Sequence, residues 1–390
     1  MRRLAVLLLF ASVLRAAGDR VATIRALLIP MRKAPIADAR GATPALTDVK
    51  HQLRDWIEAH LATLQWKDGR WTTNPTVLQE QLNHELSGAG LFCQDATCGQ
   101  SELGYLDRVV LEMQAGFLVV RSSVGLQNCG TDDSAYIYEW AGNRWGRIWQ
   151  SEQNNYKEKT YLPQRLVDVK ISPTDWQAES DHTSHLIVTT GVFPWCSSVL
   201  YPVYYRVWQT KSTYATPLLL LDESEQADIG DPIHVRVNRN EVFIEFQVVA
   251  DEAMRVPEFL HYVLANGKLR RTDPVALTPQ DFVSYWLRRS WREASEWTAP
   301  TERAKLKAWR TRYKGSNSEF ASPTHRCTRH PDLWQVASDS GAGSDSDLHY
   351  FLIRARPPFR FTMVAASDHP WPDCTVDDPA IDNAPDFFDR

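Results

Sequence analysis

Runs of aromatic and β-branched residues, separated by short turns rich in Gly and Asn, fill most of the sequence after residue 106. The first four runs lie at Asp107–Met113, Phe117–Val124, Ala135–Trp140 and Arg144–Gln150. Gly116 lies in the turn that joins the first pair, and Gly142 lies in the turn that joins the last pair. Such runs joined by tight turns are typical of neighbouring antiparallel strands. This region therefore has to fold as β-sheet, and its first unit has four strands.

The four-strand pattern recurs along the sequence. The second and third units and a partial fourth unit lie at Arg165–Ile171, His185–Val192, Val203–Gln209 and Ala215–Leu221; at Ile233–Val237, Val242–Val249, Phe259–Ala265 and Lys268–Thr272; and at Asp332–Ala337, His349–Ala355 and Phe359–Ala366. Cys129 and Cys196 both follow the second strand of their unit, and each has a tyrosine nine residues later. A repeat of this kind predicts a tandem array of similar sheets.

Tandem four-stranded antiparallel units resemble the blades of a β-propeller, at the level of the fold only and over roughly residues 105–370. The resemblance implies a mainly β protein with four blades, or five if the N-terminal region donates strands. A β-sandwich with long loops is the competing architecture. The sequence resembles no specific family.

Helices are predicted before the β region and inside it. Residues 19–44 show no periodicity and are interpreted as a linker. Apolar residues at helical spacing and the start signal Asn74-Pro75 predict an N-terminal helical segment over 45–104. The β domain then occupies 105–390, and Thr278 begins a helical hairpin inserted over 278–315.

The N-terminus is typical of a secretory signal peptide. Arg2 and Arg3 precede an apolar stretch, Leu4–Leu14, and residues 16–18 are small. Eleven apolar residues are too few to span a bilayer, and no later segment is long enough. Cleavage after residue 18 would leave a secreted or periplasmic protein.

Six cysteines remain in the exported protein, where an oxidising compartment favours disulfides. The blade arrangement implies a Cys129–Cys196 bond between neighbouring loops. Cys93–Cys98 would then close a small local loop, and Cys327–Cys374 would tie the last unit. The spacing of His325, Cys327 and His330 also suits a metal site, but the disulfide is the preferred interpretation.

The blade arrangement also implies that the long loops lie together on one rim, which propellers commonly use for ligands. The residues predicted to form a ligand site there are Asp132, Asp133, Trp195, Asp251, Glu252, Asp339, Asp345 and Asp347. Trp195 would stack on a ligand. The acids between 339 and 347 have oxygens suited to calcium, although not at the spacing of a known calcium loop.

The main expectation is an exported, non-catalytic protein that binds a ligand or a protein through this acidic rim. The partner would be a small molecule, a glycan or a cationic protein. Nucleic acid is excluded, because the net charge is −5 and no basic footprint is present. The alternative is a secreted hydrolase of glycans or peptides with rim carboxylates as acid and base. No Gly-x-Ser-x-Gly or phosphate-binding loop is present.

Overall fold

The computed structural model of the 390-residue protein divides into two compact units, Met1–Ser224 and Glu225–Arg390. No described helix is both long and apolar enough to cross a membrane. The structure describes residues 19–33, 43–64, 66–67, 70–71, 74–93, 103–126, 130–142, 144–152, 165–177, 183–192, 200–210, 216–228, 233–251, 254–273, 275–312, 319–339, 348–356 and 360–377.

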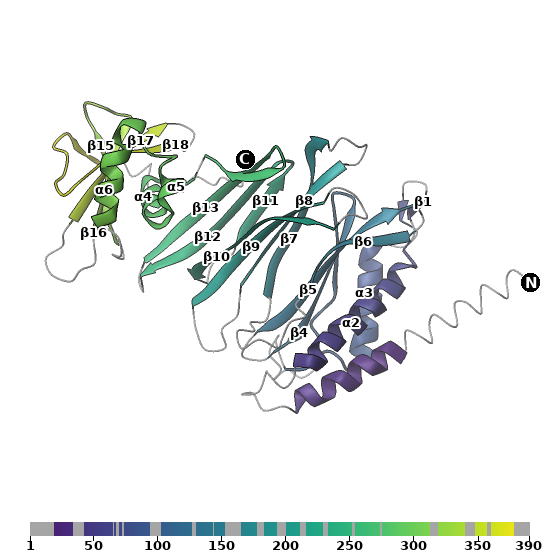
Figure 1. The fold of residues 1–390 in the computed structure, drawn as a ribbon. Coiled ribbons are helices and arrows are strands. Elements are labelled where there is room, and N and C mark those ends of the chain that lie inside the picture. Colours follow the sequence, from purple (N-terminus) through teal and green to yellow (C-terminus); the bar gives the residue numbers. More distant parts are fainter. Residues whose placement is uncertain are drawn as a thin grey trace, which may run out of the picture. The chain divides into compact units, whose positions relative to one another are not determined.

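The first unit contains two four-stranded antiparallel sheets in which each strand pairs with the next in sequence (Figure 1). The first sheet consists of β3 (Val110–Gln114), β4 (Phe117–Gly125), β5 (Thr131–Ala141) and β6 (Arg144–Ser151). The second consists of β7 (Arg165–Gln177), β8 (Thr183–Val192), β9 (Leu200–Thr210) and β10 (Leu218–Asp228).

The second unit contains one more four-stranded sheet of this kind and a five-stranded sheet. The third sheet consists of β11 (His234–Asn238), β12 (Glu241–Asp251), β13 (Met254–Ala265) and β14 (Lys268–Arg271). The fourth sheet consists of β15 (Glu319–Cys327), β16 (Leu333–Asp339), β17 (Leu348–Arg356), β18 (Arg360–Ser367) and β19 (Cys374–Asp377). The mainly β, propeller-like pattern of tandem antiparallel units is confirmed. Asn266 and Gly267 form the β13–β14 turn at φ 52° and 68°, as an Asn-Gly hairpin requires.

The fourth sheet has two strands that sequence periodicity missed. β15 has an irregular register between Ala321 and His325, which hides its alternation. β19 pairs with β15, so that Cys327 lies opposite Cys374, and the two are joined by the disulfide that the sequence predicts. A bond of this kind typically contributes about 2–4 kcal/mol to stability. Cys93 is also disulfide-bonded, but Cys98, Cys129 and Cys196 lie outside the described residues, so their pairings stay predictions.

The N-terminal helices share one apolar core with the first sheet. A helix over residues 19–32 contributes Ile24 and Leu28, which are fully buried, so this part of the predicted linker is helical. Two short strands, β1 (Trp66–Lys67) and β2 (Arg70–Trp71), lie between α2 (Thr43–Leu61) and α3 (Pro75–Gly88). Trp56 of α2 and Leu82 of α3 pack in the same cluster as Leu118 of β4. The first compact unit therefore continues past residue 104, where the sequence predicted a boundary.

The other face of the first sheet packs on the second sheet. Ile137 and Trp149 from the first sheet meet Leu166, Ile187 and Tyr204 from the second. Strand β5 is consequently buried on both faces along most of its length. Face-to-face packing of consecutive meander sheets is the propeller-like feature of this unit.

The helical insert of the second unit is also confirmed. It consists of α4 (Pro279–Arg288), α5 (Trp291–Ala294), the 3-10 helix η3 (Pro300–Glu302) and α6 (Arg303–Arg312). Thr278 caps α4 by accepting a hydrogen bond from the Asp281 amide at 3.1 Å. Trp286 and Trp309 pack against Val336 and Phe351 of the fourth sheet. The large rings of the insert therefore serve mainly as core.

Candidate functional site

The predicted rim acids Asp132 and Asp133 lie within strand β5 and not in a loop. Asp132 is 0% exposed and faces Lys50, whose Nζ lies 3.0 Å from its Oδ1. Asp133 accepts a hydrogen bond from the Leu166 amide at 2.7 Å, and burial raises its pKa to about 6. Both carboxylates have structural roles, so the prediction that they line a solvated ligand site is wrong.

The remaining rim residues do not complete a site among the described residues. Asp251 and Asp339 end β12 and β16, where the structure describes their backbone. Trp195, Glu252, Asp345 and Asp347 lie outside the described residues. Across the described ranges, no group of three or more His, Cys, Asp or Glu is arranged to hold a metal ion.

The histidines His185 and His325 belong to no metal centre among the described residues. Cys327 is bonded to Cys374, so the His325, Cys327 and His330 metal interpretation is wrong. His185 packs edge-on against Phe117 at 4.5 Å between ring centres, and burial lowers its pKa. His182, three residues earlier in the sequence, lies outside the described residues.

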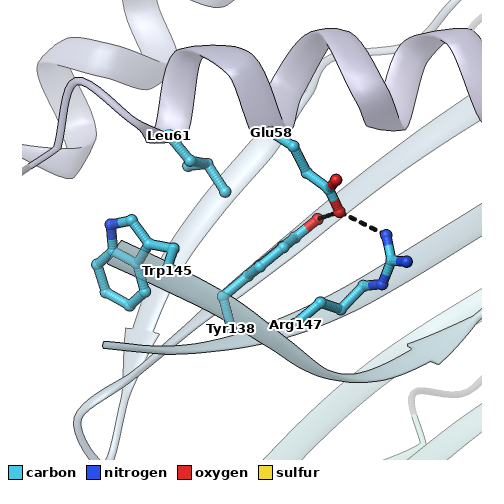
Figure 2. Close-up of a pocket in the computed structure, with 5 residues that line it drawn as sticks. All are labelled: Glu58, Leu61, Tyr138, Trp145 and Arg147. Carbon is cyan, nitrogen blue, oxygen red and sulfur yellow. Dashed lines mark hydrogen bonds and ion pairs between the residues drawn. The ribbon is translucent and has the colours of Figure 1, made fainter. Parts of the chain in front are cut away.

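A cavity of about 340 Å³ lies beside α2 and the β5–β6 hairpin (Figure 2). Its lining residues are Glu58, Leu61, Tyr138, Trp145 and Arg147. The first two come from the last turns of α2, and the other three come from the hairpin. None of the five was singled out from the sequence as a site residue.

Glu58 belongs to a polar row along α2. The apolar face of the helix is buried in the core, and Lys50, Arg54 and Glu58 follow one another at four-residue spacing beside it. Each reaches β5 or the end of β6: Lys50 meets Asp132, Arg54 meets Glu152, and Glu58 meets Tyr138. The row therefore sets the register of the helix on the sheet.

A β-bulge places the hairpin residues of the cavity. Ile137 pairs with Trp149 whereas its neighbour Tyr138 pairs with Arg147, so Ile148 is the additional residue. Trp149 can then join the core between the two sheets while Arg147 lines the cavity. In a regular strand, residues 147 and 149 would share one face.

The carboxylate of Glu58 is anchored through one oxygen. Its Oε1 accepts hydrogen bonds from the Tyr138 hydroxyl at 3.1 Å and from the Arg147 guanidinium. Among the described residues its Oε2 has no partner, and Figure 2 shows both dashed contacts ending on one oxygen. The Glu58 side chain is 36% exposed. This arrangement orients a carboxylate and leaves one of its oxygens accessible to a ligand.

Tyr138 acts as a permanent donor in this arrangement. Burial, followed by the nearby Glu58 charge, raises the pKa of its hydroxyl far above the ordinary value. The hydroxyl therefore stays protonated and continues to donate to Glu58.

A second carboxylate, Glu152 after the end of β6, meets the polar row and is fully engaged. Glu152 has a side chain that is 0% exposed, accepts from Arg54 at 2.7 Å and accepts from the Tyr136 hydroxyl at 2.8 Å. Arg147 lies 6.0 Å over the Tyr136 ring, which links this group to the cavity wall. Glu152 is therefore held in structural contacts, whereas the Glu58 carboxylate is partly exposed in the cavity.

No family model matches the protein, and no curated protein matches it. Solved structures that match include an α-L-arabinofuranosidase from Fusarium graminearum with an iminosugar inhibitor, at 10% identity and a TM-score of 0.26. That match covers 66% of each protein, just under two thirds of the arabinofuranosidase. A complex of BT0996 with RGII matches at 10% identity and a TM-score of 0.23, over 68% of this protein and 87% of that one. A structure described as a glycoside hydrolase matches at 8% identity and a TM-score of 0.23, over 68% and 88%.

The expectation of a non-catalytic binding protein is corrected. The acidic rim on which it depended is not assembled by the described residues, because Asp132 and Asp133 are buried in a strand. The matched structures named above include an α-L-arabinofuranosidase and a glycoside hydrolase, and none of these is named as a non-catalytic binding protein.

Proposed function

We propose that the protein is an exported enzyme that hydrolyses glycans, with the α2 cavity as its substrate site and Glu58 as its reactive carboxylate. The observation that carries the proposal is the fixed geometry of Glu58, anchored at Oε1 and accessible at Oε2 in a cavity of about 340 Å³. Export is supported by the predicted signal peptide and by the Cys327–Cys374 disulfide.

The lining of the cavity suits a sugar. Its volume lies in the range of small-molecule sites, and it combines apolar surface with a few oriented polar groups. Trp145, which is partly exposed, offers apolar surface to the C–H face of a sugar ring. Glu58 can accept a hydrogen bond from a sugar hydroxyl group, and Arg147 can donate one to the oxygen of such a group.

Glycoside hydrolysis generally uses two carboxyl groups, one on each side of the bond that breaks. Glu58 is the one carboxylate among the five lining residues, and we assign it the role of base toward the attacking water, while a solvent water supplies the proton that the leaving oxygen takes up. Tyr138 and Arg147 orient it by holding Oε1, so that Oε2 takes the proton.

The variant Glu58→Gln is expected to lower kcat about a hundredfold, because an amide cannot accept the proton in this role. The assay is a panel of aryl glycosides and polysaccharides, beginning with an aryl α-L-arabinofuranoside. The matched control is Glu112→Gln, which removes a 44% exposed glutamate of the same sheet that lies 3.9 Å from Arg121. Wild-type turnover that survives in Glu58→Gln, or no turnover of any glycan by the wild type, would overturn the proposal.

Trp145→Ala is expected to raise KM about three- to tenfold with kcat nearly unchanged, since a ring contact is worth about 1 kcal/mol. Its matched control is Trp140→Ala. Trp140 makes the 5.4 Å edge-to-face contact with Trp145 but does not line the cavity. Equal changes of KM in the two variants would assign Trp145 to hairpin packing and remove it from the substrate site.

A further inference from the structure

The helical insert has a net charge opposite to that of the rest of the protein. Residues 279–312 contain eight Arg and Lys against four Asp and Glu, a net charge of +4. Because the whole protein has a net charge of −5, the remaining residues sum to −9. The insert is therefore a locally basic element of an acidic protein.

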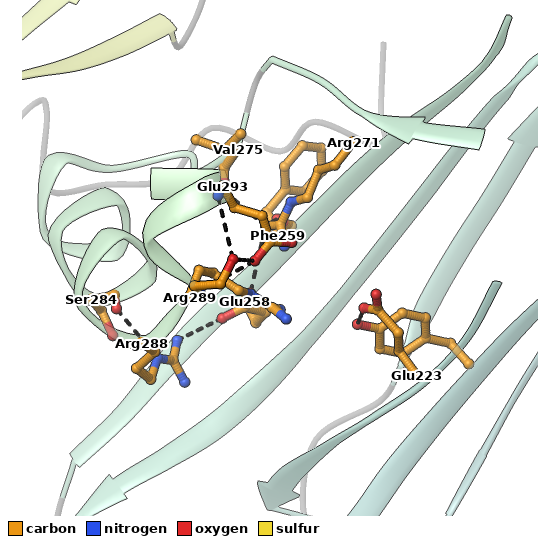
Figure 3. Close-up of polar contacts among 11 residues, drawn as sticks. Glu223, Glu258, Phe259, Arg271, Val275, Ser284, Arg288, Arg289 and Glu293 are labelled. Atoms are coloured by element: carbon orange, nitrogen blue, oxygen red, sulfur yellow. Dashed lines mark hydrogen bonds and ion pairs between the residues drawn. The ribbon is translucent and has the colours of Figure 1, made fainter. Parts of the chain in front are cut away.

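Some of these basic residues have clear structural roles (Figure 3). Glu258 of β13 is 4% exposed and lies 2.6 Å from Arg288, 3.0 Å from Arg289 and 3.5 Å from Arg271. Burial raises the pKa of Glu258, but the three arginines outweigh it and hold that pKa below its ordinary value. Arg310 donates to the carbonyl oxygens of Leu287 and Arg289. These arginines connect the helices of the insert to one another and to the third sheet.

The outer face of α6 has basic residues without such a role. Arg303, Lys305 and Lys307 are exposed, Lys305 to 81%. Among the described residues Arg303 and Lys307 have no ion-pair partner, and Lys305 comes only within 3.9 Å of Glu302. The ten residues of α6 include no acid.

Helix stability does not account for this arrangement. Cations in the first turn of a helix oppose its dipole, and α6 has no acidic residue there. Arg303 and Lys307 are four residues apart, where like charges repel each other. A bound polyanion would offset both the repulsion between these cations and the helix dipole and the repulsion between Arg303 and Lys307.

We propose that the exposed face of α6, formed by Arg303, Lys305 and Lys307, binds an acidic polysaccharide. A lipid surface is disfavoured, because the other exposed residues are small or polar (Ala304, Ala308 and Thr311) and offer no apolar side chain for insertion. Nucleic acid is disfavoured, because no aromatic side chain of the described insert is exposed for stacking. The choice of a polysaccharide as the partner rests on the proposed function, whereas the basic surface is observed independently of that function.

The test measures binding of the full mature protein to immobilised polygalacturonate at low and at physiological salt. The triple variant Arg303→Glu, Lys305→Glu, Lys307→Glu is expected to bind at least tenfold more weakly and with a weaker salt dependence. The control variant Lys268→Glu, Arg270→Glu, Arg329→Glu makes the same charge change at exposed residues of the same unit outside the insert. It is expected to bind within about threefold of the wild type.

Equal loss of binding in both triple variants would overturn the proposal, because net charge alone would then explain the affinity. Tighter binding to duplex DNA or to phosphatidylglycerol vesicles than to polygalacturonate would overturn the choice of partner. Glu58→Gln is expected to retain polygalacturonate binding. If the protein binds polygalacturonate through α6 but hydrolyses no glycan, the proposed function is contradicted and the binding role of α6 is retained.

Discussion

Replacement of Lys50 by Met is expected to lower the free energy of unfolding of the first unit by about 3–5 kcal/mol. The Lys50 Nζ lies 3.0 Å from Asp132 Oδ1, and the two side chains are 1% and 0% exposed. The substitution removes the ammonium group that Asp132 faces and leaves a carboxylate charge in a low-dielectric core. Urea unfolding at pH 7, followed by tryptophan fluorescence, measures the change.

Two further variants test whether the loss of stability arises from the burial of the charged pair or from ion pairing as such. Lys170 lies 3.3 Å from Asp168 at a partly exposed site, and Lys170→Met is expected to cost less than about 1 kcal/mol. The double variant Lys50→Met, Asp132→Leu removes both buried charges and is expected to recover most of the stability. A loss below about 1 kcal/mol in Lys50→Met, or no recovery in the double variant, would contradict the prediction.

The second large effect is a dependence of stability on pH that arises at Asp281. Burial raises the pKa of this carboxyl from 3.8 to about 7, partly offset by its hydrogen bonds to Thr278. Since the pKa in the folded state lies above that in the unfolded state, the folded protein binds the proton more tightly. The stabilisation is fully present below about pH 4 and is lost as pH rises to about 7, in total about 4 kcal/mol.

Asp281→Asn keeps an oxygen acceptor for Thr278 and removes the titration. The difference in unfolding free energy between wild type and variant is therefore expected to shift by about 4 kcal/mol between pH 4 and pH 8, in favour of the variant at the higher pH. Asp222→Asn, at an exposed acid paired with Arg206, is the control for a general carboxylate effect. Parallel stability curves for wild type and Asp281→Asn would rule the assignment out.

Local patterns were sufficient to predict most of the sheets, because alternation and turn residues are properties of neighbouring positions. They also located the insert, since Thr278 and the apolar stripe after it lie within a few turns of one helix. β15 was not predicted, because the alternation of its side chains is interrupted between Ala321 and His325. β19 is only four residues long and depends on β15 for its pairing.

The candidate site was not predictable in the same way, because its contacts span large sequence separations. Asp132 was expected in a loop, but its partner Lys50 is 82 residues away. Glu58 and Tyr138 are 80 residues apart and meet only when α2 packs on the sheet. The one available signal was the four-residue spacing of Lys50, Arg54 and Glu58 beside an apolar helical stripe. This spacing indicates that the three polar side chains lie in a row on the side of the helix that packs on the protein.

The additional residue in β6 divides the strand between two surfaces. Ile148 and Trp149 pack together in the core between the two sheets, whereas Arg147, directly before them, lines the cavity beside α2. Strict alternation would turn residues 148 and 149 to opposite faces, so the bulge gives the core between the sheets two consecutive residues while Arg147 stays on the α2 side. The strand can therefore change its core residues and its cavity residue independently. A protein with this hairpin can gain or lose the anchor of Glu58 by substitution at position 147 while the packing of the two sheets is kept.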